Sequence, residues 1–235
     1  QDVLIWTDVA GIYTTDPRVV PNAQRIDTMS FSEAAEMATF GAKVLHPATL
    51  LPAVRSNIPV YVGSSKAPQE GGTWVTRNPQ PRPTFRAIAL RRDQTLLTLS
   101  SLNMLHAQGF LANIFTILAK HKISVDTITT SEVSVALTLD KTGSASSGAS
   151  LLSEELLREL SEFCTVKVDV GLSLIALIGN ELHTASGVAK RIFETLDAYN
   201  IRMISYGAST NNICLLADSD KADDIVRVLH RSLFE

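Results

Sequence analysis

The chain contains the same structural unit twice, and this duplication limits its fold more than any other feature of the sequence. The segment GFLANIFTILAKHKISVDTITTS, from Gly109, aligns without gaps to GVAKRIFETLDAYNIRMISYGAS, from Gly187, at an offset of 78 residues. The residues that coincide are Gly109/Gly187, Ile114/Ile192, Phe115/Phe193, Leu118/Leu196, Ile123/Ile201 and Ser131/Ser209. Self-similarity at a fixed spacing indicates one supersecondary unit present in two copies.

Each copy predicts the element order strand, helix, strand, strand, helix. The helices carry apolar stripes, Phe110, Ile114, Phe115 and Leu118 in the first copy and Val188, Ile192, Phe193 and Leu196 in the second. TVKVDV supplies a fourth strand to the first copy, and we expect FRAIALRRD, upstream of that copy, to supply the fourth strand of the second. This order predicts two ferredoxin-like βαββαβ domains of the α+β class, at residues 98–170 and at 85–97 with 171–235.

The first 80 residues have a different pattern, in which strands alternate with helices. VLIWT and VYVGSS predict buried strands, and MSFSEAAEMATFG begins a helix with a Ser30-x-x-Glu33 capping box. Such alternation predicts a mostly parallel α/β layer whose ligand lies beyond the carboxyl ends of the strands. Residues 64–84 are rich in Gly, Pro and polar side chains, so we expect the boundary between the domains there.

Composition excludes several classes of function. The net charge of -3, from 21 basic and 24 acidic residues, offers no field that would attract nucleic acid or an anionic membrane. The longest apolar runs, such as LSLIALIG, are too short to span a bilayer. Cys164 and Cys214 lie in apolar stretches and are interpreted as buried thiols in a reducing cytoplasm.

Polar residues that suit a nucleotide follow the predicted strands of the first domain. Phosphoryl transfer requires mainly positioning and neutralisation of charge, so an aromatic hydroxyl for the base and cations for phosphates are the expected residue types. The candidates are Thr7, Asp8, Tyr13, Asp16, Arg18 and Lys43. The alternative is that Asp8 and Asp16 only form turns and that Arg18 and Lys43 are solvated.

A second polar stretch, HKISVDTITTSEVSVALTL at 121–139, carries many hydroxyls and one early carboxylate, Asp126. It is either a solvated, β-prone sheet face or the rim of a site for a small polar ligand. At the offset of 78, Asp126 aligns with Ile204 and Ser124 with Arg202. Because the second copy keeps the scaffold without the polar set, the comparison favours a ligand held by the first copy.

Three strings, FGAKVLHPATLLPAVRS, SLNMLHAQGFLANIF and ISVDTITTSEVSVALTLD, resemble the aspartate kinases, most closely their monofunctional, lysine-sensitive type. The resemblance covers the whole chain. It implies the C-terminal part of an amino-acid kinase fold followed by tandem ACT domains. It also implies transfer of the ATP γ-phosphoryl group to the β-carboxylate of L-aspartate, giving 4-phospho-L-aspartate for lysine biosynthesis, with Mg²⁺ beside ATP and no organic cofactor.

The same resemblance assigns residues to two sites. ATP would contact Thr7, Asp8, Tyr13, Arg18, Lys43 and the backbone at Val44. L-Lysine, as feedback inhibitor, would contact Met104, Ala107, Phe110, Leu111, Ser124, Val125, Asp126, Thr130 and Ser131. Asp126 is the expected partner of the lysine side-chain ammonium, with Glu132 as second candidate.

The family's Gly-rich phosphate loop, catalytic lysine and most aspartate-binding residues would precede Gln1. We therefore expect neither catalytic residues nor protein metal ligands in this chain, and no turnover by the chain alone. Tandem ACT domains imply a homodimer or higher homo-oligomer. Two alternatives stay open: a non-catalytic amino-acid-sensing module, and a kinase whose effector is threonine or methionine.

Overall fold

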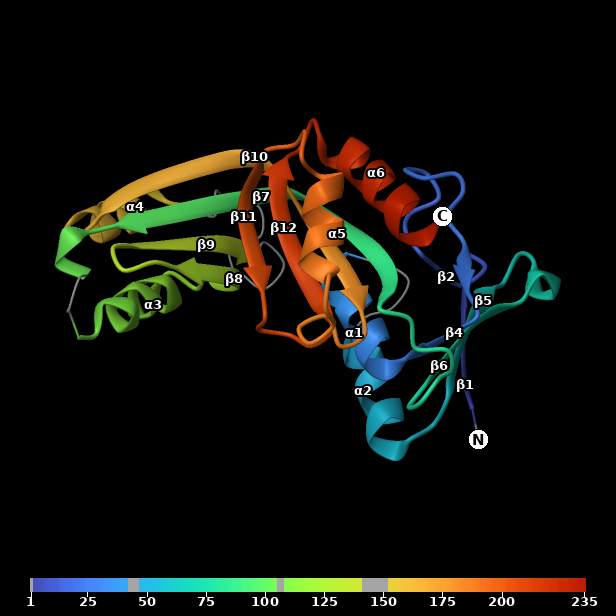
Figure 1. Cartoon of the computed structure of the whole chain (residues 1–235). Coiled ribbons are helices and arrows are strands. Elements are labelled where there is room, and N and C mark those ends of the chain that lie inside the picture. The colour runs from blue at the N-terminus through green and yellow to red at the C-terminus, as the bar shows by residue number, and fades with distance from the viewer. Residues whose placement is uncertain (1, 42–46, 105–107, 141–151) are drawn as a thin grey trace. The chain divides into compact units, whose positions relative to one another are not determined.

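The computed structural model of the chain describes residues 2–41, 47–104, 108–140 and 152–235 (Figure 1). The chain forms two compact units: unit 1 comprises Gln1–Arg91 and Ser173–Glu235, and unit 2 comprises Arg92–Leu172. Two long strands, β7 (Phe85–Ser100) and β10 (Thr165–Gly179), contribute one part of their length to each unit. The finer limits drawn from the sequence, 1–80, 98–170 and 85–97 with 171–235, stay a prediction.

The N-terminal part of unit 1 is built on a four-stranded sheet in the order β1-β5-β6-β4. The strands are β1 (Val3–Thr7), β4 (Thr28–Ser30), β5 (Val60–Ser64) and β6 (Gly72–Thr76). β1 runs parallel to β5 and β4 parallel to β6, whereas β5 and β6 are antiparallel. The sheet is therefore mixed, and β6 is an inner strand inside the stretch 64–84 that composition marks as a boundary.

Shorter elements complete this part of unit 1. They are β2 (Ile12–Tyr13), β3 (Arg25–Ile26), α1 (Phe31–Thr39), α2 (Pro47–Ser56) and the 3₁₀ turn η1 (Pro68–Glu70). α1 begins with the predicted capping box: the Glu33 N–H donates to Ser30 Oγ at 3.1 Å, and the Ser30 N–H donates to Glu33 Oε2 at 2.6 Å. Both bonds satisfy backbone donors that a helix start otherwise leaves without partners.

The second repeat lies in unit 1 and consists of β10, α5 (Val188–Thr195), β11 (Ile201–Tyr206), β12 (Asn212–Asp218) and α6 (Ala222–Phe234). Its strand order is β11-β12-β10-β7, so β7 supplies the fourth strand as predicted. α5 and α6 pack on the same face of this sheet, because Ile192 and Leu229 share one core with Ile175, Leu177 and Leu215.

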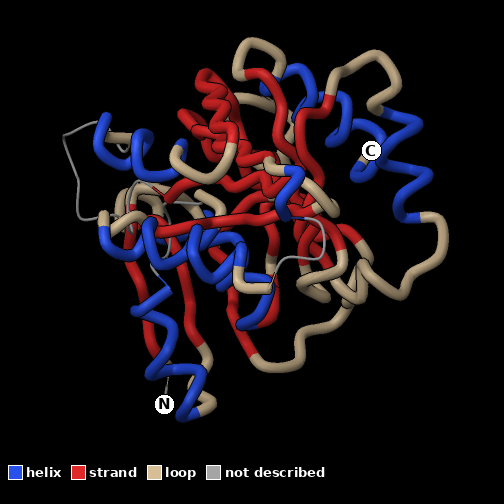
Figure 2. The backbone as a smooth tube through the Cα atoms, turned by 90° about the vertical axis from the view of Figure 1, so that its left-hand side faces the viewer, coloured by secondary structure: helices blue, strands red, loops and turns tan. Residues whose placement is uncertain are grey.

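The first repeat forms unit 2 with the order β7, α3 (Phe110–Lys120), β8 (Ser124–Thr130), β9 (Ser134–Asp140), α4 (Glu154–Ser161) and β10, preceded at α3 by the 3₁₀ turn η2 (Leu102–Met104). α3 and α4 pack against β7 and β9 (Figure 2). Phe110, Ile114 and Leu118 face this core as predicted, whereas Phe115 is 39% exposed, which contradicts its place in the stripe.

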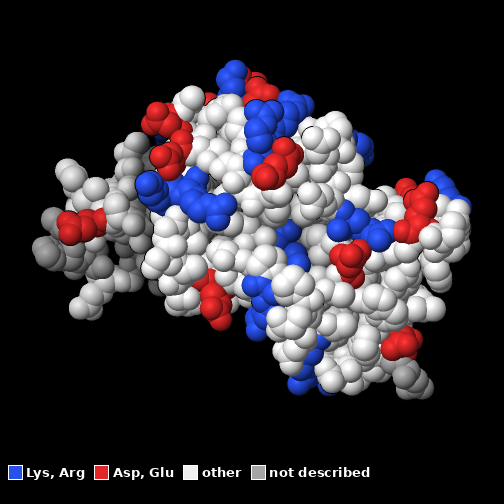
Figure 3. Space-filling view, turned by 45° about the vertical axis from the view of Figure 1, so that its right-hand side comes forward, with Lys and Arg blue, Asp and Glu red and all other residues white. Residues whose placement is uncertain are grey.

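The surface agrees with the charge argument. On the face shown in Figure 3, basic and acidic side chains are interspersed on a largely uncharged surface, with no continuous basic region. Cys164 and Cys214 are free and buried as predicted, and burial raises the pKa of the Cys164 thiol. Among the described residues, no helix is both long enough and apolar enough to cross a bilayer.

Candidate nucleotide and effector sites

The carboxyl ends of β1 and β5 meet at one edge of the first sheet. Thr7 and Ser64, the last residues of these parallel strands, are register partners. Thr7 Oγ1 donates to Asp8 Oδ1 at 3.1 Å, and the Thr7 carbonyl accepts from the N–H and the hydroxyl of Ser65 at 2.7 and 3.0 Å. A carboxylate and several hydroxyls thus lie where α/β sheets bind ligands. Ser64 and Ser65 were missed from the sequence, although the pattern VGSS after a buried strand could have indicated them.

Arg18 lies in the loop after β2 and is held by Asp16. Asp16 accepts from the Arg18 N–H at 2.9 Å, from Nε at 3.0 Å and from Nη2 at 2.7 Å, and these bonds raise the pKa of Arg18. The Asp16 carbonyl also accepts from the N–H groups of Val19 and Val20. Asp16 is therefore a turn former, as one interpretation held, and it orients a guanidinium that is 88% exposed.

The hydroxyl of Thr73, on β6, fixes the strands that lie on either side of the same loop. The Ile12 N–H donates to Thr73 Oγ1 at 2.8 Å, and this hydroxyl donates to the Ile26 carbonyl at 2.6 Å. The side chain is fully buried on β6. One hydroxyl therefore joins β2, which ends at Tyr13, and β3 to the sheet.

Thr73→Val is expected to lower the free energy of unfolding of unit 1 by about 1–3 kcal/mol, because it leaves the buried Ile12 N–H without its acceptor at nearly unchanged volume. Urea denaturation followed by the fluorescence of Trp6 and Trp74 measures this. Thr76→Val, on the same strand but less buried, is the matched control. Equal stability of the two variants would contradict the anchoring role.

Lys43, Val44 and Ala107, which the resemblance places in the two sites, lie outside the described residues. Tyr13 ends β2 and Arg18 lies in the loop after it, whereas Thr7 ends β1 and Asp8 follows it. Their role in binding ATP stays a prediction.

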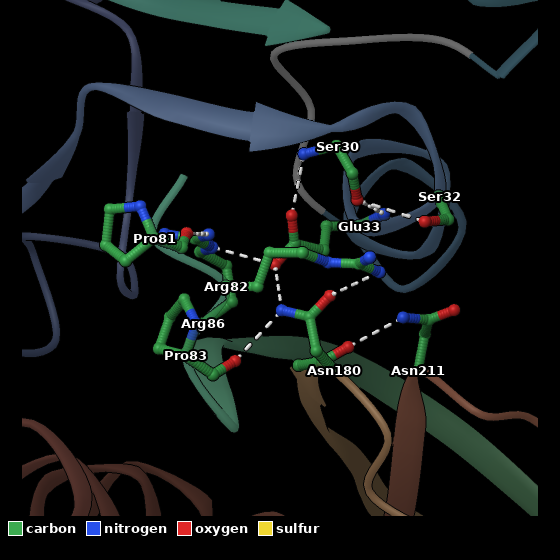
Figure 4. A network of polar contacts seen from close by, with 10 residues as sticks. Ser30, Ser32, Glu33, Pro81, Arg82, Pro83, Arg86, Asn180 and Asn211 are labelled. Carbon is green, nitrogen blue, oxygen red and sulfur yellow. Dashed lines mark hydrogen bonds and ion pairs between the residues drawn. The ribbon is translucent and has the colours of Figure 1, made fainter. Parts of the chain in front are cut away.

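A buried polar network connects α1 to the second repeat (Figure 4). Glu33 Oε1 accepts from Arg86 Nε and from Asn180 Nδ2, both at 2.8 Å. Arg86 Nη2 donates to the Pro81 carbonyl at 2.8 Å, and Asn180 Nδ2 donates to the Pro83 carbonyl at 2.9 Å. Burial raises the pKa of Glu33, but the Ser30 N–H and the Arg86 guanidinium outweigh it, so the net pKa lies below the usual range.

One helical turn further along, Glu36 makes a second connection. Its carboxylate accepts from the Ser209 hydroxyl at 2.8 Å and from Asn212 Nδ2 at 2.7 Å. Ser209 and Asn212 precede and begin β12 of the second repeat. Both carboxylates of α1 are thus held by the second repeat within unit 1.

In unit 2, the predicted effector residues gather on β8 and at the start of α3. β8 is an edge strand of its sheet, and its pairing with β9 shifts between Val125 and Thr127. Asp126 is the extra residue at this shift. Such bulges redirect a side chain and are frequent beside functional sites.

The strand pairing corrects the residue-by-residue comparison of the two copies. β11 shows a similar shift between Ile201 and Met203, where the extra residue is Arg202. By position in the sheet, the counterpart of Asp126 is therefore Arg202 rather than Ile204. The two copies present opposite charges at this point, and Arg202 pairs with Asp218 at 3.2 Å.

The start of α3 offers backbone donors. Gly109, with φ of 83°, caps the helix without a side-chain hydrogen bond. Phe110 is 8% exposed and packs edge-on against Phe163, so only its backbone is open to a ligand, whereas Leu111 is 37% exposed. Met104 packs on the core of unit 2, as its chemistry suggests. Unsatisfied N–H groups at a helix start favour a carboxylate.

The remaining predicted effector residues lie at the two ends of β8. Thr130 is exposed, and the Ser131 hydroxyl accepts from the Ser134 N–H at 3.1 Å within the turn to β9. Ser124 and Val125 are half-buried beside Asp126. The predicted effector residues that the structure describes thus lie in unit 2, on η2, at the start of α3, and on β8 and the turn after it.

Comparison with known proteins agrees with this architecture. Residues 1–64 match the amino acid kinase family, and residues 175–233 match the ACT domain. Lysine-sensitive aspartokinase 3 of Escherichia coli is 66% identical over 231 residues, which are 98% of this chain and 51% of that protein. Chloroplastic aspartokinase 2 of Arabidopsis thaliana is 39% identical over 243 residues, covering 100% of this chain and 44% of that protein.

Two solved structures are also similar. The E. coli aspartokinase III complex with aspartate and ADP, described as the R-state, superimposes with a TM-score of 0.93 at 65% identity, covering 100% of this chain and 52% of the other. The complex with lysine and aspartate, described as the T-state, gives 0.89 at 64% identity with the same coverage.

The fold and the matches define a kinase-type α/β segment joined to ACT domains. The chain belongs to the aspartokinase family. It spans about half the length of the relatives that it matches.

Proposed function

We propose that the chain carries the nucleotide side and the regulatory region of an ATP-dependent aspartate kinase inhibited by L-lysine. The observation that carries this proposal is the 66% identity, over 98% of the chain, to a relative described as lysine-sensitive. The related structures hold aspartate with ADP, or lysine with aspartate, which supports L-aspartate as substrate and lysine as effector. The product is 4-phospho-L-aspartate, an intermediate of lysine biosynthesis, and we assign the protein to the cytoplasm.

The proposed nucleotide site combines the strand edge at Thr7 and Asp8 with Tyr13, at the end of β2, and Arg18, in the loop after it. Arg18 is pre-oriented by Asp16, so a phosphate would share or replace an existing carboxylate contact. Mg²⁺ would enter with ATP, held mainly by phosphates and water.

The proposed effector site accounts for a free diamino acid. The uncapped start of α3 suits the α-carboxylate, and Asp126, on its bulge, suits the side-chain ammonium. Lysine can inhibit only if it binds more tightly to a conformation with a misaligned kinase site than to the active one. β8 is an edge strand with Ile128 38% exposed, which supports association of two chains through ACT domains.

Isothermal titration of the 235-residue chain tests the effector. We expect lysine to bind with one site per chain, because the second repeat has Arg202 where the first has Asp126. Threonine and methionine are expected to bind at least tenfold more weakly, since neither has a cation for Asp126, a difference of about 1.4 kcal/mol. If threonine or methionine bound as tightly as lysine, the expected preference for lysine would be wrong. If either bound more tightly, it would replace lysine as the proposed effector.

Titration with MgADP separates the kinase from a non-catalytic sensor. Saturable binding that Arg18→Ala weakens would support the nucleotide site. Lysine binding without any nucleotide binding would favour the sensor, in which the kinase-like segment is only structural.

A further inference from the structure

The loop between β2 and β3, which follows Tyr13 and carries Arg18, packs partly into the core of the second repeat. Val19 and Val20 are 8% and 6% exposed and belong to the same apolar cluster as Ile225 and Leu229 of α6. All of these residues lie in unit 1. Movement of the loop would therefore disturb packing against α6, so the loop and the helix are physically coupled.

Thr14, next to Tyr13, is fixed through every polar group that it has. Its N–H donates to the Gln24 carbonyl at 2.8 Å, and its carbonyl accepts from the Ile88 N–H of β7 at 2.7 Å. Its hydroxyl accepts from the Gln24 N–H at 3.0 Å and bonds His230 Nε2 of α6 at 2.9 Å. Thr14 and His230 are 7% and 0% exposed. A buried hydrogen bond of this kind is costly to break without a replacement.

The surroundings of the His230 ring favour one direction for this bond. Nδ1 lies 3.3 Å from Glu235 Oε1, and the ring stacks on Phe234 with centroids 5.0 Å apart. A proton on Nδ1 faces the carboxylate favourably, whereas a bare lone pair there would be repelled. In the neutral ring, Nε2 then accepts the Thr14 hydroxyl proton.

Arg227, one helical turn before His230, holds the other side of the loop. Its Nε donates to the Val19 carbonyl at 3.1 Å, and its Nη1 donates to Asp224 at 2.8 Å. A groove of about 210 Å³ runs beside this contact, lined by Val20, Pro21, Asn22, Arg227, Arg231 and Glu235. The hydrogen bond to the Val19 carbonyl therefore holds the loop in addition to the packing of Val19 and Val20.

We propose that α6 positions the loop of the nucleotide site. Its positioning residues are His230, which acts through the bond to Thr14, and Arg227, which acts through the bond to the Val19 carbonyl. Thr14 and Val19 bracket the segment that carries Asp16 and Arg18, so the two bonds set where the Arg18 guanidinium lies. The inference rests on the proposed nucleotide site. It assigns to the second repeat, which has Arg202 at the position of Asp126, a part in positioning the nucleotide site.

The test compares His230→Leu with His230→Gln in the 235-residue chain. Gln places an amide close to the position of Nε2 and can either donate or accept, so it rescues the bond to Thr14 whichever group carries the proton. We expect His230→Leu to weaken MgADP binding about fivefold, because affinity falls with the fraction of chains whose loop is competent. His230→Gln should stay within about twofold of the original chain. Thr14→Val and Thr14→Ser form the reciprocal pair, and exposed His183→Leu is the matched control.

Amide hydrogen exchange supplies a readout that needs no nucleotide. In His230→Leu, the N–H groups of Thr14, Val19 and Val20 should exchange faster than in His230→Gln, while the N–H groups of β12 stay protected. Faster exchange throughout unit 1 would indicate general destabilisation and overturn the proposal. Equal loop exchange in the two variants would overturn it as well. If the original chain binds no MgADP, the proposed nucleotide site of this chain fails, and the exchange result still decides whether α6 positions the loop.

Discussion

Glu33→Ala is expected to lower the free energy of unfolding of unit 1 by about 3–5 kcal/mol, the cost of removing one partner from a buried ion pair. Arg86 is 8% exposed and would keep only the Pro81 carbonyl as partner, so its charge would stay buried without compensation. Asn180 Nδ2 would keep the Pro83 carbonyl but lose the Glu33 carboxylate, and the Ser30 N–H would lose its cap. The loss of stability arises from polar groups that stay buried without the Glu33 carboxylate. Smaller changes at Glu33 should therefore also be costly.

Two further variants separate charge from packing. In Glu33→Gln, the amide oxygen can still accept from Arg86, but the amide nitrogen then faces the Ser30 N–H, a contact between two donors. The double variant Glu33→Leu with Arg86→Met removes both charges and is expected to be more stable than Glu33→Ala. Both tryptophans, Trp6 and Trp74, lie in unit 1, so their fluorescence in urea reports this unit.

The exposed Glu70→Ala is the control and should change the free energy by less than about 0.5 kcal/mol. A loss below 1 kcal/mol in Glu33→Ala would contradict the buried pair.

The same carboxylate predicts part of the acid sensitivity. The pKa of Glu33 is lowered in the folded chain, so the unfolded chain binds its proton more readily. The stabilisation is complete above the unfolded pKa of about 4.3 and is lost as the pH falls through the lower folded pKa. Urea midpoints measured from pH 7 down to pH 3 should therefore fall more steeply for the original chain than for Glu33→Gln. Parallel curves would show that Glu33 titrates normally.

Patterns within one element predicted much of the fold. The repeat at an offset of 78 and the need for a fourth strand placed FRAIALRRD beside the second repeat, because a strand count depends only on sequence order. The Ser30-x-x-Glu33 pattern likewise predicted the capping box, whose two bonds span three residues. The helix stripes held except at Phe115.

Predictions from the sequence failed where the composition of a segment is typical of a turn but pairing with distant strands buries it. β6 was missed because its Gly and Thr residues, next to Gly- and Pro-rich segments, are typical of a turn. The strand is formed by pairing with β5 and β4 and by the burial of Thr73 and Val75. The gapless alignment also could not predict the bulge at Asp126, because the shift in strand pairing that forms it is not visible in the spacing of the sequence.

Contacts between distant segments were the least predictable. Glu33 meets Asn180 across 147 positions and Thr14 meets His230 across 216. Neither pair shows a motif, since each side chain is ordinary for its own helix, strand or loop. The candidate site residues came from the resemblance to a family. The structure added the hydrogen bonds and packing contacts that fix some of them in place.

Asp126→Ala is expected to weaken lysine binding by roughly 30-fold, about 2 kcal/mol, because a charge-assisted hydrogen bond to the side-chain ammonium is lost. Asp126→Asn should lose nearly as much, since the amide keeps the shape but not the charge. Norleucine, which has no side-chain ammonium, should bind the original chain and Asp126→Ala with similar affinity. The substitution would therefore remove the preference for lysine over norleucine as well as lowering the affinity.

Glu132→Ala is the matched control for this prediction, because Glu132 is the other candidate anion and lies exposed in the turn after β8. Its removal should change lysine affinity less than about fivefold, since an exposed ion pair contributes at most about 1 kcal/mol. Isothermal titration of the three chains at one ionic strength makes the comparison. A large loss in Glu132→Ala with an unchanged Asp126→Ala would move the ammonium contact from the bulge to the turn. If neither substitution changed the affinity for lysine, the lysine site would have to lie elsewhere, because neither Asp126 nor Glu132 would then contribute to binding.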